Sequence, residues 1–252
     1  KVFRYSLLNQ GFDVTALTLD QEIPEDVNVL VIAEMKAPFS EEELGRLNRY
    51  IERGGNLLIA GDAERQEVMN PVVAPFGVKF LPGRLVQEGE HVANLIVGNV
   101  TRESCNLNYM FRDMFHVYSV TMPDAVALEC DTTKGFTVTP LLVTKNKGSW
   151  IEYKTTDFVD DKAELNPEDG EVEQANLTAL ALNRKVGDKD QKIIILGDAD
   201  CISNEEFSIR RNLRVMTANY TLVTGTFYWL SDEEAPIDVR RPMGTDNKIH
   251  LS

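Results

Sequence analysis

The chain has 252 residues, of which 43% are hydrophobic and 26% are charged, a composition that suits one elaborated globular domain or two small ones. Its 26 basic and 40 acidic residues give a formal net charge of -14, which repels the phosphates of nucleic acids and so excludes them as expected partners. The longest apolar runs are far shorter than the ~18 residues that indicate a transmembrane helix.

The first part of the chain alternates between strands and helices, as βαβ units do. Its clearest helix begins after Ser40, a good N-cap with Glu43 at the capping-box position, and ends at Gly54 and Gly55. The apolar run that follows is short enough to be a central parallel strand that is covered on both faces. The expected elements are a short helix ending at Asn9, strands over residues 13–17, 27–33 and 56–60, and the helix after Ser40.

Prolines and glycines interrupt this alternation from Asn70 onward, and residues 78–183 have the pattern of short strands and turns. We therefore expect residues 78–183 to form a β-rich insertion or subdomain, and residues 1–77 and 184–231 to form one discontinuous α/β domain. Within the insertion, the stretch 152–174 contains nine carboxylates and is typical of a solvated loop. A calcium site there is the weaker alternative, because the regular oxygen-ligand loop with its central Gly and terminal Glu is missing.

After the insertion, the chain returns to longer elements. An apolar run over residues 193–196 predicts another buried strand, and it leads directly into the sequence Gly-Asp-Ala-Asp. The expected elements are strands over residues 177–182 and 193–196, a helix capped by Ser203 or Asn204 that continues through Leu213, a helix over 220–230, and an exit linker toward a membrane over 232–252.

The two core strands over 56–60 and 193–196 both end in Gly-Asp. In an open parallel sheet, ligands gather at the carboxyl ends of strands, so Asp62, Asp198 and Asp200 are the candidate binding residues. If they converged, they could hold a hard cation such as magnesium, with an amide oxygen from Asn204. The same residue types are also the usual way to leave a strand, since Gly permits a tight turn and Asp caps the next helix. We favour this second interpretation.

No catalytic residue, resident metal or cofactor is predicted. A cysteine enzyme of the amidotransferase kind needs a thiol on the sharp turn after a core strand, where Asp62 and Ala63 stand instead. The chain also lacks the glycine-rich patterns that cradle dinucleotide or ATP phosphates. Two alternatives remain open: a metal-assisted hydrolase that uses Asp62, Asp198 and Asp200, and a sugar-binding domain that uses the surface of the β-rich insertion.

Three segments of the chain resemble a known family, the extracytoplasmic domain of gliding-motility-type (GldG-like) ABC transporter auxiliary or permease proteins, which is distantly similar to intraflagellar-transport-type domains. The segments are IPEDVNVLVIAEMKAPFSEEELGRLNRYIERGGNLLIAGD, KIIILGDADCISN and NLRVMTANYTLVTGTFYWLSDEEAPIDVR. The resemblance covers roughly residues 1–75 and 190–241. Asp62, Asp198, Asp200 and Asn204 carry over as motif positions, without catalytic roles. The chain departs from the pattern at Ala199, where the family often has Ser, and at Cys201, which replaces an aromatic residue.

The resemblance implies a flavodoxin-like or amidotransferase-like α/β fold, with a parallel sheet flanked by helices and without catalytic machinery. It implies a location at the periplasmic face of the inner membrane, held there by helices that flank this fragment. The implied function is that of an interaction or ligand-binding module of an ABC-type export system. The implied partners are the membrane and ATPase subunits of the transporter, with an envelope component or a glycan as a further candidate.

Overall fold

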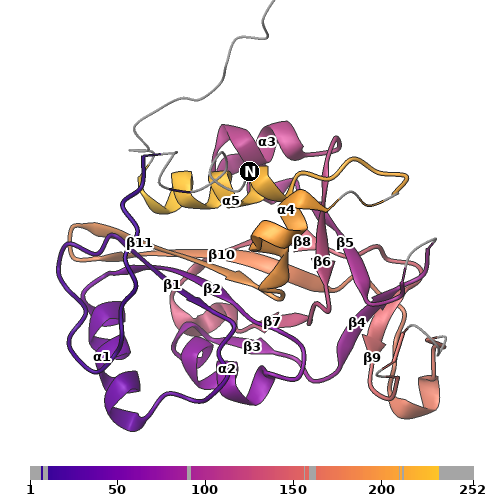
Figure 1. The fold of residues 1–252 in the computed structure, drawn as a ribbon, viewed down its shortest axis with the longest axis horizontal. Coiled ribbons are helices and arrows are strands. Elements are labelled where there is room, and N and C mark those ends of the chain that lie inside the picture. The colour runs from indigo at the N-terminus through magenta and orange to yellow at the C-terminus, as the bar shows by residue number, and fades with distance from the viewer. Residues whose placement is uncertain are drawn as a thin grey trace, which may run out of the picture.

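The computed structural model describes residues 7, 11–89, 92–155, 157–158, 163–209, 211 and 213–232. In this part of the chain, the main sheet has seven strands in the order β1-β2-β11-β10-β8-β5-β6 (Figure 1). The strands are β1 (Val29–Ala33), β2 (Asn56–Ala60), β5 (Leu95–Val100), β6 (Ser119–Pro123), β8 (Thr137–Val143), β10 (Leu177–Val186) and β11 (Lys189–Leu196). Strands β1, β2 and β11 are parallel, and each of the other strands joins its neighbour in the antiparallel direction.

The expected flavodoxin-like parallel sheet is not confirmed, because parallel pairing is confined to three strands and the sheet as a whole is mostly antiparallel. The reason lies in the connection between β10 and β11. These strands pair from Val186 opposite Lys189 onward, so a tight turn at Gly187 and Asp188 joins them as a hairpin. Gly187 takes a φ of 59°, which such a turn requires. A hairpin forces its two strands to be antiparallel, and it reverses the direction of the sheet beyond β11.

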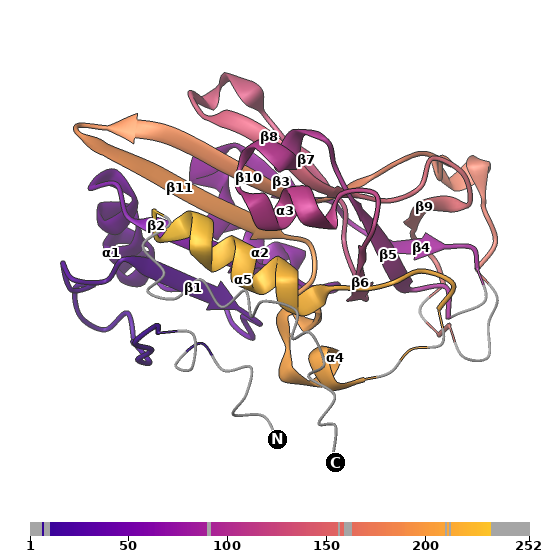
Figure 2. The ribbon, with the colours of Figure 1, turned by 90° about the horizontal axis from the view of Figure 1, so that it is seen from above.

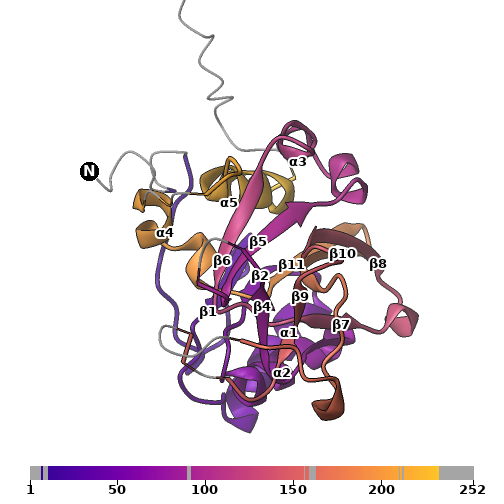
Figure 3. The ribbon, with the colours of Figure 1, turned by 90° about the vertical axis from the view of Figure 1, so that its right-hand side faces the viewer.

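Strands from the expected β-rich insertion continue the main sheet. Besides β5, β6, β8 and most of β10, residues 78–183 contribute two small two-stranded sheets. These pair β3 (Val78–Phe80) with β7 (Leu128–Cys130), and β4 (Arg84–Gln87) with β9 (Ser149–Glu152). Figure 3 shows that the sheet curls, so that β5 and β6 stand steeply against the direction of β10 and β11.

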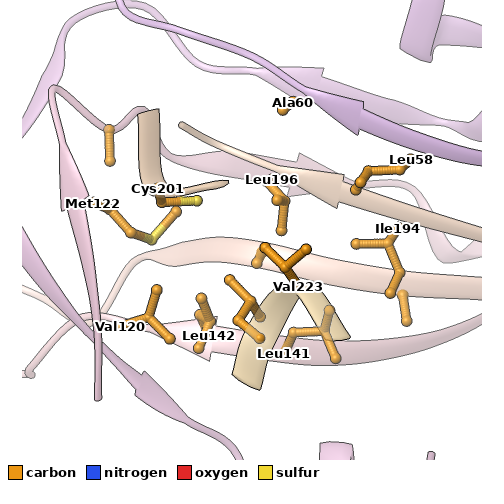
Figure 4. Packing of buried hydrophobic residues seen from close by; sticks show 14 of the residues in the cluster. Leu58, Ala60, Val120, Met122, Leu141, Leu142, Ile194, Leu196, Cys201 and Val223 are labelled. Atoms are coloured by element: carbon orange, nitrogen blue, oxygen red, sulfur yellow. The ribbon is translucent and has the colours of Figure 1, made fainter. Parts of the chain in front are cut away.

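Helices cover both faces of the sheet (Figures 1 and 2). They are α1 (Glu41–Glu52), α2 (Gln66–Val73), α3 (Tyr109–Met114), α4 (Asn204–Ser208) and α5 (Asn219–Leu230). Leu57 and Ile59 of β2 belong to the hydrophobic cluster under α1 and α2, whereas Leu58 and Ala60 belong to the cluster under α3 and α5. In Figure 4 the side chains of Leu58 and Ile194 lie on the same side as Val223 of α5. The expectation that β2 is covered on both faces is confirmed.

The helix expected after Ser40 is confirmed, including its cap. The backbone N–H of Ser40 donates to Oε2 of Glu43 at 2.7 Å, and the N–H of Glu43 donates to Oγ of Ser40 at 3.3 Å. These reciprocal bonds satisfy N–H groups that have no partner inside the helix. They fix where α1 begins, which the sequence pattern had placed correctly.

Several expected elements differ from the structure. Residues 13–17 are not a strand. The helix expected through Leu213 is wrong, because α4 ends at Ser208. A helix, α2, forms across Pro71, where the sequence predicted a break, because it buries Met69, Val72 and Val73. The helix expected to end at Asn9, apart from Leu7, and the linker after Asp232 lie outside the described residues.

In the part of the chain that the structure describes, no helix combines the length and the apolar character that crossing a membrane would require.

Candidate functional site

Asp198 forms the turn that follows β11. Its side chain is fully buried, with Oδ1 accepting the N–H of Asp200 at 2.8 Å and Oδ2 accepting the N–H of Cys201 at 3.1 Å. Burial raises the pKa of Asp198 well above its usual value, the carboxylates of Asp200 and Asp62 raise it further, and the two N–H bonds oppose the rise. Both carboxyl oxygens therefore accept N–H groups at the start of the 3-10 turn Asp200–Ile202.

The glycine before each strand-end aspartate is needed for close packing. A Cβ on Gly197 would lie 2.2 Å from the backbone oxygen of Val126, and a Cβ on Gly61 would lie 2.5 Å from the ring of Phe80. The N–H of Val126 donates to the carbonyl of Gly197 at 2.9 Å. The segment after β6 therefore crosses directly over the end of β11. An open parallel sheet leaves this position for a ligand, and here the chain occupies it.

Asp62 lies beside this crossing and is half-buried. Its pKa rises to about 6, first because of burial and then because of the nearby carboxylates of Asp200 and Asp124, while a bond from the N–H of Ala63 lowers it. Partial burial also raises the pKa of Asp200, and the charges of Glu34 and Asp124 add to that rise. The charge of Asp200 thus raises the pKa of both Asp62 and Asp198, and we call these three residues the carboxylate cluster at the carboxyl ends of β2 and β11.

The sequence pattern missed Asp124, whose charge also raises the pKa of Asp62 and Asp200. Arg84 of β4 donates from Nη1 to Oδ1 of Asp124 at 3.0 Å and also pairs with Glu64, and Asn94 donates from Nδ2 to the same Oδ1 at 2.8 Å. The backbone at Glu64 and Asp124 has φ values of 63° and 57°, which are uncommon for residues other than Gly. No sequence signal joins these residues, because they come from separate loops that only the fold brings together.

Asn204 does not join the cluster. It is the first residue of α4 and is exposed, and within the described ranges its side chain makes no hydrogen bond to the three aspartates. The N-cap is Ser203, whose Oγ accepts the N–H of Glu206 at 3.1 Å. Among the residues that the structure describes, no three His, Cys, Asp or Glu side chains are grouped so that they could hold a metal ion.

A second polar cluster joins α4 to β6 and α5. Arg211 donates to the buried carboxylate of Glu206 from Nε at 2.8 Å and from Nη2 at 2.6 Å, and the hydroxyl of Thr121 also bonds to Glu206. Asn219 donates from Nδ2 to the carbonyls of Thr121 at 2.7 Å and Cys201 at 2.9 Å, and its Oδ1 accepts the N–H of Thr121 at 3.0 Å. This cluster fixes the outer edge of β6, and its polar atoms are used within the fold.

In fold, the chain is similar to the mmIFT52 N-terminal domain, with a TM-score of 0.58 and 15% identity over 82% of this chain and 78% of that one. A putative ThuA-like protein from Bacteroides uniformis has a TM-score of 0.43 and 15% identity over 81% of this chain and 69% of that one. No curated protein matches the chain.

The similarity to mmIFT52, at 15% identity, shows the fold alone. A protein-family model carries more information, because it matches residues 1–225, which is most of the 252-residue chain. Its description is an ABC-type uncharacterized transport system. The chain belongs to this family of ABC transport auxiliary proteins.

Proposed function

We propose that this chain is a non-catalytic extracytoplasmic domain of an ABC-type export system, in which it acts as an interaction or ligand-binding module. Its partners would be the membrane and ATPase subunits of the transporter, at the periplasmic face of the inner membrane. Membership of the ABC transport auxiliary family supports this role. The finer assignment to a gliding-motility-type system rests on the three sequence segments quoted above.

The main support for a non-catalytic role is that the protein's own chain occupies the end of β11, where a substrate would bind. Both oxygens of Asp198 accept backbone N–H groups, and the segment that contains Val126 crosses over Gly197. At the end of β11, where an open parallel sheet would bind a substrate, Asp198 therefore stabilises a turn and Gly197 lies under a crossing segment. This supports a module that acts through its outer surface.

Co-purification tests the partnership. The full reading frame that contains this chain would be tagged in its native host, extracted in mild detergent, and analysed for the ATPase and membrane subunits encoded with it. We expect these subunits to be enriched over those of an unrelated ABC transporter in the same membranes. Equal recovery of both sets would contradict the proposal.

Cysteine labelling tests the location. Asp188 lies exposed in the β10–β11 turn, so Asp188→Cys in a background of Cys105→Ser and Cys130→Ser offers one accessible thiol, since the third native thiol, Cys201, is buried. We expect a membrane-impermeant maleimide to label it in cells whose outer membrane alone is permeabilised. Labelling that appears only after the inner membrane is opened would place the domain in the cytoplasm.

The metal-assisted hydrolase is the second candidate, because the charge of Asp200 raises the pKa of both Asp62 and Asp198 at the strand ends, although no three acidic, His or Cys side chains of the described residues are grouped to hold a metal ion. Calorimetric titration with magnesium separates the two functions. We expect the wild-type chain and the Asp200→Asn variant to give the same weak, unsaturable heat. Saturable binding that Asp200→Asn abolishes would favour the hydrolase.

A further inference from the structure

A cavity of about 470 Å³ opens between α3, α4 and the beginning of α5. Aromatic and hydroxyl side chains line much of it, and the rings of Phe207 and Tyr220 meet edge to face with centroids 6.0 Å apart. Tyr118 and Thr217 contribute further lining, and Asp113 places a carboxylate in it. We call this cavity the α3–α5 groove. It is separate from the carboxylate cluster at the strand ends.

Exposed hydrophobic side chains are frequent in the chain segments that line the groove. Eleven large hydrophobic residues are exposed in the described part of the chain, and five of them line the groove or stand within two residues of a lining residue. We call these five the groove-side patch: Val117, Tyr118, Ile209, Val215 and Met216. Exposed apolar side chains that gather in one place, rather than being scattered singly, mark an interaction site.

The backbone beside the groove presents an unpaired edge. The N–H of Ser119 donates to the carbonyl of Met216 at 2.9 Å, and the N–H of Ala218 donates to the carbonyl of Ser119 at 3.0 Å. These bonds form a parallel bridge between Ser119 and Thr217, so residues 216–218 extend the sheet beyond β6. In such a bridge, the N–H and C=O of Thr217 point away from β6. No described backbone group bonds to them, and Thr217 is exposed.

We propose that this edge and the α3–α5 groove bind an extended segment of a partner protein, which adds a strand along Thr217 and inserts a hydrophobic side chain into the groove. The backbone pairing would supply affinity, and the groove would supply specificity, as in other cases of strand addition. The proposal rests on the proposed function and names the surface through which a transporter subunit would bind.

The charge of the partner segment follows from the groove. Asp113 is exposed and has no ion-pair partner among the described residues, and the chain as a whole has a net charge of -14. Asp113 is the one charged residue among the described residues that line the groove, so the complementary segment carries Lys or Arg beside its hydrophobic anchor.

Peptide selection tests this inference. Random peptides displayed on phage would be selected against the immobilised 252-residue chain, and the enriched sequences would be synthesised and titrated by fluorescence anisotropy. We expect alternating hydrophobic residues with a Lys or Arg. Met216→Asp should weaken binding about tenfold or more, because it places a charge in the patch. The matched control is Val172→Asp, since Val172 is 57% exposed and Met216 is 58% exposed.

Two further measurements make the test specific. Selection against Asp113→Lys should enrich peptides with Asp or Glu in place of the basic residue. The amide of Thr217 should exchange with solvent more slowly, by about tenfold, when the wild-type chain is saturated with the selected peptide. Peptides that bind wild-type and Met216→Asp equally would overturn the proposal. So would an absence of peptide binding together with Met216-dependent binding of hexose oligosaccharides or of phosphatidylglycerol vesicles.

The co-purification experiment separates this inference from the proposed function. If the wild-type full-length protein recovers its transporter subunits and the Met216→Asp variant recovers them equally well, the proposed function stands and the docking site is wrong. If the wild-type protein recovers no subunits, the proposed function itself fails. Loss of recovery with Met216→Asp but not with Val172→Asp supports both.

Discussion

The aspartates at the strand ends have the same local sequence but different structural roles. Asp198 is buried and bonded through both oxygens to N–H groups, so its carboxyl group maintains a turn. Asp62 is half-buried beside other carboxylates, and its pKa is raised to about 6. Burial makes ionisation of both carboxyl groups less favourable in the folded state, but that of Asp198 is also bonded to two N–H groups of a turn. Their shared Gly-Asp sequence predicted the position of both residues and the role of Asp198.

The raised pKa of Asp62 predicts how the stability change caused by replacing this residue depends on pH. Since its pKa is about 6 when folded and 3.8 in the unfolded reference, the folded state holds the proton more tightly, and the contribution of Asp62 to stability falls as pH rises from about 4 to about 6. Asp62→Asn removes this unfavourable charge. After a discount for partial exposure, the variant should be more stable than wild type by about 1–2 kcal/mol near pH 8, and the difference should vanish near pH 4.

Urea unfolding at both pH values measures this difference. Asp188→Asn serves as the control, because Asp188 is exposed in the β10–β11 turn and its replacement should leave the unfolding free energy unchanged. A stability difference for Asp62→Asn that stays constant from about pH 4 to about pH 8 would show that the charge of Asp62 is not responsible.

At the scale of elements, the fold depends on strand pairing and also on contacts where a connecting segment crosses the end or the edge of a strand. The segment after β6 crosses over Gly197 at the end of β11, and residues 216–218 with the side chain of Asn219 cover the outer edge of β6. The helix cap at Ser40 and the apolar run of β2 were predictable, because each signal lies within a few residues. The helix across Pro71 was not, because burial of its apolar side chains outweighs the hydrogen bond that proline removes.

Two replacements of glycine by alanine should change the free energy of unfolding in opposite directions. Gly197→Ala should destabilise the protein by about 2–4 kcal/mol, because the new Cβ would lie 2.2 Å from the backbone oxygen of Val126 and backbone cannot move aside cheaply. Gly45→Ala, in the middle of α1, should stabilise it by about 0.5–1 kcal/mol, because the nearest atom is 3.6 Å away and alanine favours helix.

Chemical denaturation of the two variants beside wild type checks this prediction. The Gly45→Ala variant controls for the general effect of adding a methyl group. If Gly197→Ala were as stable as wild type, the segment after β6 would not lie against the end of β11, and the carboxyl ends of the parallel strands would be open to a ligand.

At the scale of the whole molecule, the main sheet joins parts that the sequence separates. The division into residues 1–77 with 184–231 and an inserted 78–183 remains a proposal. Strand β10 pairs with β11 on one side and with β8 on the other, so the sheet runs without a break from the α/β part into the insertion. We therefore expect the two parts to unfold together, even if they arose as separate units.

The two tryptophans allow this expectation to be tested. Trp150 lies in β9 within the insertion, and Trp229 lies in α5 of the α/β part, and both are buried. In Trp150→Phe and in Trp229→Phe, the remaining tryptophan reports on one part, while circular dichroism reports on the whole. Coincident fluorescence and dichroism transitions in each variant are expected. A fluorescence midpoint that departs from the dichroism midpoint of the same variant would indicate separate unfolding units.

The sequence by itself determined the local features of this protein: the capped helix α1, the buried runs of β2 and β11, the final helix, and the Gly-Asp turns. Each depends on residues that are close along the chain. The tertiary structure alone decided which strands are neighbours, which way they run, and what covers the strand ends. A short apolar strand that is buried on both faces has the same pattern whether its neighbours are parallel or antiparallel. The choice depended on the hairpin at Gly187 and on contacts such as Gly197 with Val126.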